Sequence, residues 1–402
     1  MIKKIKQMIV KIIIKPYFSS PWGRRKSFKS MLCLSISCRG TETGGMALKE
    51  RHEPSGETAK RKGEHIRICL QEDVEGKGGG TGLAQYRFIH NALPELSFTD
   101  IRLDTEWLGC LMKAPLLVSS MTGGTDEAGA INRRLAIAAE ERGWAIGLGS
   151  MRAAIEKEEL AETFRIRREA PTIPVIANVG AVQLNYGFGV ENCRRAVELA
   201  EANALVLHLN GLQEVFQPEG DTNFSGLLKK IEAVCANSAV PVGVKEVGWG
   251  IDGETAYRLS EAGVSFIDAA GSGGTSWSQV EKFRVKDPIR REAAEAFADW
   301  GLPTAESVQA IRSHLPGISL IASGGLVTGV DAAKSLALGA NLAGFGRALL
   351  PQAAGPAKDI SLDLLLRQFE IIEFELRTAM FGIGAGTIEE LRSTARLVKK
   401  TN

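Results

Sequence analysis

The sequence has no uninterrupted apolar run of membrane-spanning length, and its cysteines are few and scattered. A helix that crosses a bilayer needs about 20 consecutive apolar residues, but Lys11 and Lys15 interrupt the apolar segment near the start of the chain. The six cysteines form no Cys-x-x-Cys pair, so their spacing indicates neither a zinc site nor a disulfide framework. Isolated thiols are typical of a reducing compartment. We therefore expect a cytoplasmic protein without stable membrane insertion.

Acidic residues are nearly absent from residues 1–45, which contain ten Lys or Arg residues and only Glu42. The rest of the chain carries 39 basic and 46 acidic residues, a net charge of −7. A domain with a net negative charge is not a general nucleic-acid binder. Two interpretations of residues 1–45 stay open. We favour a disordered or mis-assigned extension ahead of Met46 over an amphipathic segment that lies on a membrane surface.

The alternation of apolar runs and helical patterns predicts the fold. The chain has 402 residues, 44% hydrophobic and 24% charged, which suits one large globular domain. From Pro115 onward, apolar runs ending in Gly, Ser, Asn or Lys precede helical patterns, which indicates a parallel sheet covered by helices. Eight such units predict an α/β fold, a closed (β/α)8 TIM barrel, rather than a doubly wound open sheet. The predicted strands are 115–120, 144–149, 174–180, 204–210, 241–247, 266–271, 319–325 and 342–347.

Three regions follow from this pattern: the extension 1–45, an N-terminal arm and lid at 46–110, and the barrel at 111–402 with C-terminal helices near 360–395. Residues 46–82 are polar and Gly-rich, so we expect a flexible arm and loop there. Residues 277–311 break the rhythm between the sixth and seventh strands. We expect this insertion to be a loop beside the barrel mouth, where barrels carry functional loops.

Polar residues and glycines follow the predicted strands, where barrel enzymes place their chemistry. The last two strands lead into ASGG (322–325) and GFGR (344–347), and glycine loops at this point let backbone N–H groups approach a phosphate. Lys245 ends the fifth strand and could neutralise an anionic ring system, or form a salt bridge within the mouth. Residues 208–224 supply carboxylates and amides without thiols, which suits a hard cation such as Mg²⁺. A solvated polar loop is the alternative for that stretch.

Seven segments in chain order carry a family resemblance: RKGEHI, SSMTGG, GSMR, HLNGLQE with QPEGD, KEVGWG, GSGGTSW, and ASGG with GFGR. Together they resemble the type 2 isopentenyl diphosphate isomerases, which are FMN-dependent barrels. The resemblance extends from Arg61 to about Leu391. It implies conversion of isopentenyl diphosphate to dimethylallyl diphosphate in isoprenoid biosynthesis. It further implies Mg²⁺ on the diphosphate, NADPH to reduce the flavin, and a homo-oligomer of four or eight copies.

The resemblance also assigns roles residue by residue. FMN would be held by Met121, Thr122, Gly123, Ser150, Asn178, Lys245, Thr275, Gly324, Gly325, Gly346 and Arg347. The substrate would contact Arg61, Lys62, Ser150, Met151, Arg152, His208, Asn210 and Gln213. Gln213 is the expected catalytic residue, in an orienting or proton-relay role, and Glu214 is the expected Mg²⁺ ligand. The reaction protonates an unactivated alkene, for which ordinary side chains are poor donors, whereas a reduced flavin can act as acid and base.

Three competing interpretations remain. An FMN-dependent 2-hydroxy-acid oxidase or dehydrogenase needs a histidine base near the end of a late strand, and the five histidines fit that position poorly: His52, His65, His90, His208 and His314. A nucleotide dehydrogenase of the inosine-monophosphate type needs a cysteine after the sixth strand, where this chain reads GSGGTSW. A non-catalytic flavin-binding barrel would not need Gln213, Glu214 or the Arg61–Lys62 pair.

Overall fold

The computed structural model describes residues 55–354 and 362–401, which lie within one compact unit, residues 52–402. The predicted extension 1–45, the first residues of the arm with His52, and two of the six cysteines lie outside the described residues. The four cysteines of the described part are free thiols. None of the helices in the described part is both long and apolar enough to cross a membrane.

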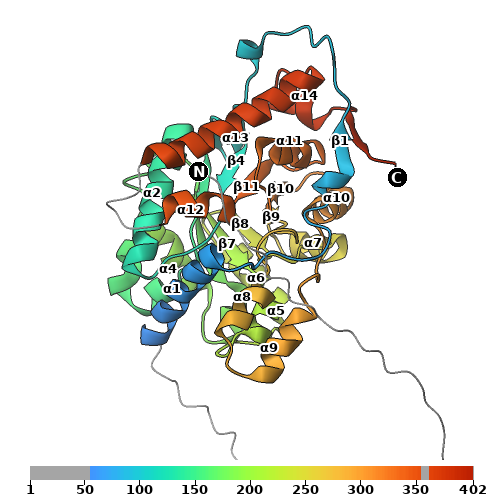
Figure 1. Cartoon of the computed structure of the whole chain (residues 1–402). Coiled ribbons are helices and arrows are strands. Elements are labelled where there is room, and N and C mark those ends of the chain that lie inside the picture. Colours follow the sequence, from blue (N-terminus) through green and yellow to red (C-terminus); the bar gives the residue numbers. More distant parts are fainter. Residues whose placement is uncertain (1–54, 355–361, 402) are drawn as a thin grey trace, which may run out of the picture. The chain divides into compact units, whose positions relative to one another are not determined.

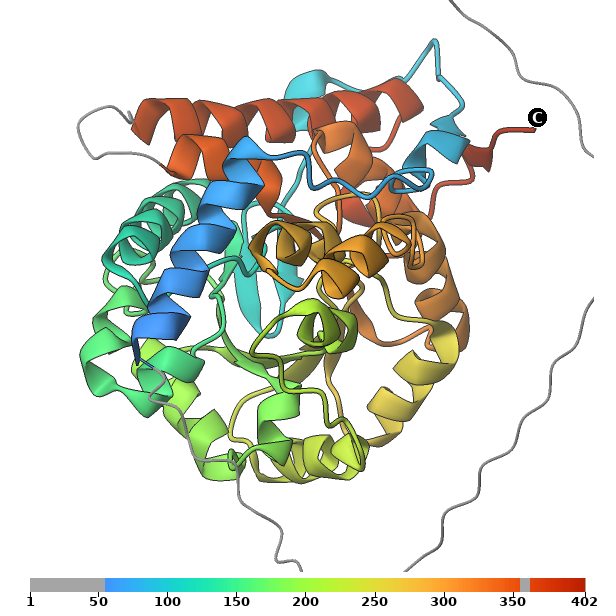
Figure 2. The ribbon, with the colours of Figure 1, turned by 60° about the horizontal axis from the view of Figure 1, so that its bottom comes forward.

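Eight parallel strands form a closed barrel, which confirms the predicted fold (Figures 1 and 2). Hydrogen bonds between the first barrel strand and the last close the ring. The strands are almost entirely buried, as expected for a sheet with apolar side chains on both faces. In chain order they are β4 (Leu116–Val118), β5 (Ala145–Gly147), β6 (Val175–Gly180), β7 (Ala204–His208), β8 (Val242–Lys245), β9 (Phe266–Asp268), β10 (Ser319–Ala322) and β11 (Leu342–Phe345).

Helices between the strands cover the outside of the barrel. Several begin at side chains that accept a hydrogen bond from the first turn, such as Thr125 before α2 and Thr328 before α11, which satisfies donors that have no partner within the helix. The unit after β5 is the irregular one, because only α3 (Arg152–Glu156) and a 3-10 turn follow that strand. The outer helices are α2 (Asp126–Arg142), α4 (Val190–Ala200), α6 (Leu227–Asn237), α7 (Gly253–Glu261), α10 (Thr304–His314), α11 (Gly329–Ala337) and α13 (Leu362–Ile383).

A short hairpin, β2 (Thr105–Trp107) and β3 (Cys110–Met112), packs against the barrel interior. The Trp107 indole packs edge-on against Phe266, with 5.3 Å between ring centroids. Its Nε1 donates to the Ser319 hydroxyl at the first residue of β10, at 2.8 Å. Because Ser319 begins its strand, the hairpin covers the amino-terminal end of the barrel, opposite the end where barrel enzymes bind ligands.

Part of the predicted arm is helical, so the expectation of a loop throughout 46–82 was wrong. Helix α1 (Ser55–Gln71) runs across the barrel (Figure 2). Gly63, in the middle of this helix, lowers its intrinsic helical tendency. Tertiary packing supplies the stability instead: Ile68 is buried with Val74 and with Val280 of helix α8 (Trp277–Arg284). Local composition could not reveal this distant partner.

The segment between β9 and β10 is also helical, which corrects the predicted inserted loop. It forms α8, α9 (Pro288–Glu295) and then α10, the regular outer helix of that unit. The insertion proper is therefore α8 and α9, which pack on each other and on α5 (Gly211–Phe216). Asp287 caps α9 and Pro288 occupies its first turn, so an Asp-Pro signal for a helix start was present in the sequence.

The first strand of the described residues pairs with the last. Strand β1 (Tyr86–Phe88) is antiparallel to β12 (Leu397–Lys399), with Tyr86 opposite Lys399. Between the barrel and β12 lie the short helices α12 (Leu350–Ala353) and α14 (Ile388–Arg392) on either side of α13, as expected for C-terminal helices that pack outside the barrel. Within this assembly, the loops that follow the barrel strands and the helix α1 enclose one cavity.

Candidate active site

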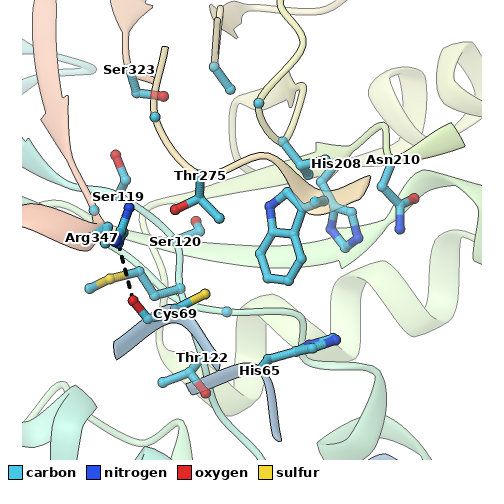
Figure 3. A pocket seen from close by; sticks show the side chains of 18 of the residues that line it. His65, Cys69, Ser119, Ser120, Thr122, His208, Asn210, Thr275, Ser323 and Arg347 are labelled. Atoms are coloured by element: carbon cyan, nitrogen blue, oxygen red, sulfur yellow. Dashed lines mark hydrogen bonds between the residues drawn. The ribbon is translucent and has the colours of Figure 1, made fainter. Parts of the chain in front are cut away.

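A cavity of about 600 Å³ lies at the carboxyl ends of the barrel strands, between the strand loops and α1. This volume is in the range of small-molecule sites. Figure 3 shows Ser119, Ser120 and Arg347 on one side, and His208 and Asn210 on the other. Of the predicted site residues, the cavity is lined by Arg61, Lys62, Met121, Thr122, Ser150, Arg152, Asn178, His208, Asn210, Gln213, Glu214, Lys245, Thr275, Gly324, Gly325, Gly346 and Arg347.

Two predicted site residues do not line the cavity. Met151 is fully buried, and its backbone N–H donates to the carbonyl of Asn178 at 2.8 Å. Gly123 lies under the ring of Phe164, so that a Cβ atom there would come within 2.1 Å of it. Both residues shape the loops beside the cavity instead of presenting side chains to it.

The glycines after β9 and β10 bring two loops into direct backbone contact. Gly324 and Gly325 have φ angles of +105° and +75°, a region that favours glycine. A Cβ on Gly324 would lie 2.1 Å from the Gly271 carbonyl oxygen, and one on Gly325 would lie 2.3 Å from that of Gly273. Glycine is therefore required here by the fold. The same bare backbone leaves N–H groups accessible to an anion.

Three cations line the side of the cavity next to α1 and α3, and two of them already have carboxylate partners. Arg61 lies 3.6 Å from Glu219. Arg152 donates to Asp221 at 2.8 Å and to Glu156 at 2.9 Å. An anionic ligand on Arg152 has to share or replace these partners.

The third cation, Lys62, has a neutral partner. Its Nζ donates to the carbonyl of Ser150 at 2.8 Å and lies over the Phe164 ring, 5.2 Å from the centroid. Burial, with a smaller contribution from the charge of Arg61, lowers the pKa of Lys62 to about 7. Lys62 can therefore gain or lose its proton near neutral pH.

Glu214 and Asn210 form a buried group of oxygens after β7. Glu214 accepts from the Asn210 amide at 2.7 Å and from the backbone N–H of Asp221 at 2.7 Å. Gly220 permits this folded-back loop, because a Cβ there would lie 1.8 Å from the Glu214 carbonyl oxygen. Burial raises the pKa of the Glu214 carboxyl group. Asn210 Oδ1 is buried and has no hydrogen-bond partner among the described residues, so this oxygen fits the role of a cation ligand.

The amide of Gln213 is oriented by a carboxylate from the insertion. Its Nε2 lies 3.3 Å from Glu281 Oε1, which leaves the amide oxygen as the acceptor for a ligand. Glu281 is completely buried and also accepts from His65 at 2.9 Å and from Arg284 at 2.5 Å. Burial works to raise the pKa of Glu281, but the bonds and charges of His65 and Arg284 outweigh it and lower that pKa. Glu281 is therefore a carboxylate that orients Gln213.

His208 presents a neutral ring to the cavity. Burial, assisted by the charges of Lys245, Lys62 and Arg61, lowers the pKa of His208 to about 3. Its Nδ1 lies 2.8 Å from the amide oxygen of Asn178, whose Nδ2 donates to Leu148. Because that amide oxygen accepts, Nδ1 carries the ring proton and Nε2 keeps a lone pair. His208 therefore offers an acceptor, and not a positive charge, to a ligand.

The rest of the cavity lining combines glycine backbone with two cations, Lys245 and Arg347. The Ser119 hydroxyl is buried and finds no partner within the described part of the chain, which fits a ligand that supplies one. Lys245 is 8% exposed, and its Nζ donates to the carbonyl of Glu246 at 2.5 Å. Arg347 donates to the carbonyl of Cys69 at 3.1 Å and to Glu75 at 2.9 Å, which ties the last barrel loop to the end of α1.

Comparison with known proteins identifies the family of this site. The family model for FMN-dependent dehydrogenases matches residues 187–398. An isopentenyl-diphosphate delta-isomerase of Oceanobacillus iheyensis is 55% identical over 84% of this chain and 95% of its own length. The chain belongs to the FMN-dependent, type 2 isopentenyl-diphosphate delta-isomerases. Isomerases of the same name from a Nostoc species and from Rickettsia typhi are 48% and 44% identical, over 97% of their own lengths.

Membership of this isomerase family confirms the predicted resemblance and makes the chain an isomerase with a flavin site. Solved oxidases share its fold. A mandelate oxidase variant has a TM-score of 0.58 and 21% identity, over 87% of this chain and 99% of its own. A putative lactate oxidase of Pediococcus acidilactici has a TM-score of 0.58 and 15% identity, over 85% of this chain and 95% of its own. At these identities the likeness shows the barrel alone.

Several residues of the isomerase cavity were not predicted from the sequence as site residues. Gln183 and Trp277 line it, and Gln183 also donates to Asp221 at 3.1 Å. The orienting carboxylate Glu281 lies in the segment that was expected to be a loop. A helical pattern with the Asp287–Pro288 start signal could have placed that segment, but no sequence signal indicates that Glu281 points toward Gln213.

Proposed function

We propose that the chain converts isopentenyl diphosphate to dimethylallyl diphosphate, with reduced FMN as the acid and base and Mg²⁺ on the diphosphate. One observation carries the proposal: a single cavity is lined by glycine loops and Lys245, by Gln213 and Glu214, and by the cations Arg61, Lys62 and Arg152. A flavin against the glycine loops and a diphosphate against the three cations would bring the alkene between them.

The cations beside α1 bind the diphosphate. Lys62 and Arg152 approach from different elements, α1 and α3, and both line the cavity. Charge-assisted bonds to a diphosphate are stronger than neutral ones, and a diphosphate would replace Asp221 as the partner of Arg152. The substrate charge barely changes during the double-bond shift, so these residues contribute mainly to binding.

Glu214 and Asn210 hold Mg²⁺ on the diphosphate. Both offer oxygens, and the Asn210 amide oxygen lacks a partner among the described residues. The described residues contain no group of three or more His, Cys, Asp or Glu that could hold a metal alone. Mg²⁺ is commonly bound by one or two protein oxygens while phosphates and water complete its shell, which suits this sparse site.

Gln213 orients the reacting carbons. Reduced FMN, when bound, supplies a proton donor and acceptor at its ring nitrogens without net redox change. The predicted flavin contacts Met121, Thr122 and Thr275 line the same cavity as Gln213. Because Glu281 fixes the Gln213 Nε2, the amide oxygen faces the reacting group and can accept or relay a proton. The helix α1 covers the cavity and limits the access of water to a cation-like transition state.

The test combines flavin binding with a reduction-dependent assay. The purified protein should be yellow or bind added FMN, and dithionite or NADPH should switch on isomerase activity when Mg²⁺ is present. Glu214→Gln, which keeps the shape but removes the charge, should raise the Mg²⁺ concentration needed for half-maximal activity. Failure to bind saturating FMN would refute the flavin site, and a reduced, FMN-loaded protein without isomerase activity would refute the reaction. Rapid flavin reduction by lactate or mandelate would support an oxidase instead.

The same proposal includes the setting of the enzyme. We propose a cytoplasmic homo-oligomer of four or eight copies, with NADPH needed only to bring the flavin to its reduced state. Sedimentation of the purified enzyme tests the assembly. A single reduction that supports many turnovers would distinguish activation by NADPH from its stoichiometric use.

A further inference from the structure

A buried carboxylate that the proposed mechanism does not use lies next to Lys245 inside the barrel. Asp268, the last residue of β9, is 3% exposed. It is paired in register with Lys245, the last residue of β8, so the two side chains leave neighbouring strands at the same level. Asp268 does not line the main cavity, but it shares with Lys245 a small cavity of about 10 Å³ in the barrel interior, near the lower limit for one water molecule.

The contacts of Asp268 fit an ionised group. Its Oδ1 accepts from the Ser323 hydroxyl at 2.6 Å and from the Ala270 backbone N–H at 3.3 Å. An O–H to carboxylate bond of that length is typical of a charged acceptor. Burial raises the pKa of Asp268, and the positive charge of Lys245 is the largest influence opposing that rise. A buried carboxylate needs a compensating partner, and Lys245 is the cation that the fold places beside it.

Lys245 therefore lies between two anionic groups, the flavin proposed for the main cavity and the carboxylate of Asp268. It lines both the main cavity and the small interior one, whereas Asp268 lines only the latter. We propose that Asp268 is a positioning residue that acts through Lys245: its carboxylate offsets part of the lysine charge and so limits how far the site stabilises the anionic form of the reduced flavin. The inference rests on the proposed function, because it takes Lys245 to face the flavin.

The consequence concerns the supply of protons for the reaction. A full, uncompensated cation next to the ring would favour the anionic reduced flavin over the neutral reduced flavin. Protonation of an unactivated alkene needs a proton on the reduced flavin. A moderate positive potential keeps the reduced flavin in its neutral, protonated form, so that this proton is available. Asp268 provides this moderation from inside the barrel without touching flavin or substrate.

Redox titration of the FMN-loaded protein tests the inference. Asp268→Asn should move the equilibrium about tenfold toward reduced flavin, equivalent to a potential about 30 mV more positive. The pH at which the reduced-flavin spectrum changes from neutral to anionic should fall. Lys245→Met should shift both quantities in the opposite direction. Asp252→Asn, which removes the carboxylate that caps α7, is the matched control and should change neither.

Opposite signs for the two variants distinguish charge compensation from a structural role, since misfolding of the site would weaken flavin binding in both. If Asp268→Asn does not retain flavin, Ser323→Ala tests the same point. Loss of the hydroxyl donor favours the protonated, uncharged form of Asp268, so it should produce a smaller shift of the same sign as Asp268→Asn. A potential equal to wild type, or a negative shift, in the variant that retains flavin would overturn the inference. A wild-type protein that does not bind FMN would overturn the proposed function instead.

Discussion

Lys62 differs chemically from the two arginines beside it. Its partner is the neutral Ser150 carbonyl, and its pKa of about 7 means that the free enzyme loses this charge as the pH rises through neutrality. A bound diphosphate favours the protonated form, so ligand binding above pH 7 must take up a proton. We predict that the Kd for inorganic diphosphate rises by up to tenfold per pH unit above pH 7.

Lys62→Arg is the matched variant for that prediction, because arginine keeps its charge throughout this range. Its Kd, measured calorimetrically from pH 6 to 9, should follow only the ionisation of the ligand itself. Parallel pH profiles for wild type and Lys62→Arg would show that Lys62 does not titrate in the site.

Arg152→Ala should act on binding. The guanidinium would contribute a charge-assisted contact worth about 1.5–3 kcal/mol, so its loss should raise KM for the substrate at least about tenfold while kcat stays close to wild type. Arg165→Ala removes an exposed ion pair with Glu162 and serves as the control. A fall in kcat at unchanged KM would show that Arg152 acts in the chemical step and not in substrate binding.

Gln213→Ala should act on the chemical step. The amide is buried and oriented by Glu281. Its removal should leave the flavin and diphosphate contacts in place, but the reacting carbons would no longer be held in position. We expect kcat to fall by about 10²-fold or more, in the range of a lost proton-transfer or orienting group, with wild-type flavin content. A wild-type kcat in this variant would show that the loop after β7 is not part of the reaction centre.

At the scale of secondary-structure elements, α1 is joined to α8 of the insertion by a network of charges. Arg284 of α8 has an 8% exposed side chain and pairs with Glu64 of α1 at 3.0 Å, with Glu219 at 2.9 Å and with Glu281. His65 of α1 reaches the same Glu281. The cover of the cavity and the orientation of Gln213 therefore depend on the same buried carboxylate.

Arg284→Ala should loosen α1 while the barrel stays folded. Removing one member of a buried ionic group typically costs about 3–5 kcal/mol because its partners remain charged, and here the partners belong to α1, α8 and the loop after α5. Backbone hydrogen exchange of residues 60–71 should accelerate while that of the barrel strands does not. Arg194→Ala breaks an exposed pair on α4 and should change neither. Unchanged exchange in α1 would show that its apolar contacts alone hold it.

The barrel elements could be predicted because each carries its own signal. A buried parallel strand is a continuous apolar run, and all eight predicted runs contain the observed strands. Helix α1 and the insertion could not be predicted in the same way. Ile68 and Glu281 are ordinary residues of polar segments until the fold brings α1 and α8 together. Asp268 is similar: it lies within the predicted run 266–271, and only its register with Lys245 gives it a role.

The same distinction, between local sequence signals and contacts that only the fold creates, applies to the cavity residues. Residues at the ends of strands, such as Lys245 and His208, could be located from the barrel pattern, because all these ends meet at one face. The role of His208, however, came from the family resemblance, whereas the position of Lys245 alone already suggested an anionic ligand. The neutral state of His208 and the pairing of Arg152 with Asp221 depend on three-dimensional neighbours that no local pattern contains.

At the scale of the whole molecule, removal of the N-terminal extension should have no effect on catalysis. The described residues, 55–354 and 362–401, contain the complete barrel and the residues that line the cavity. A variant that begins at Met46 should keep wild-type kcat, KM and thermal midpoint. A large loss of activity would assign a function to the extension. Binding of the full chain, but not of this variant, to anionic vesicles would favour the membrane-surface interpretation.

The pairing of β1 with β12 has a consequence for how the protein is made. Residues 86–88 emerge from the ribosome more than 300 residues before their partners, residues 397–399. Until residues 397–399 have been synthesised, β1 therefore remains an unpaired edge, open to contacts with other chains. Substitutions in residues 397–399 that weaken this pairing should therefore lower yield and solubility, although these residues lie outside the barrel.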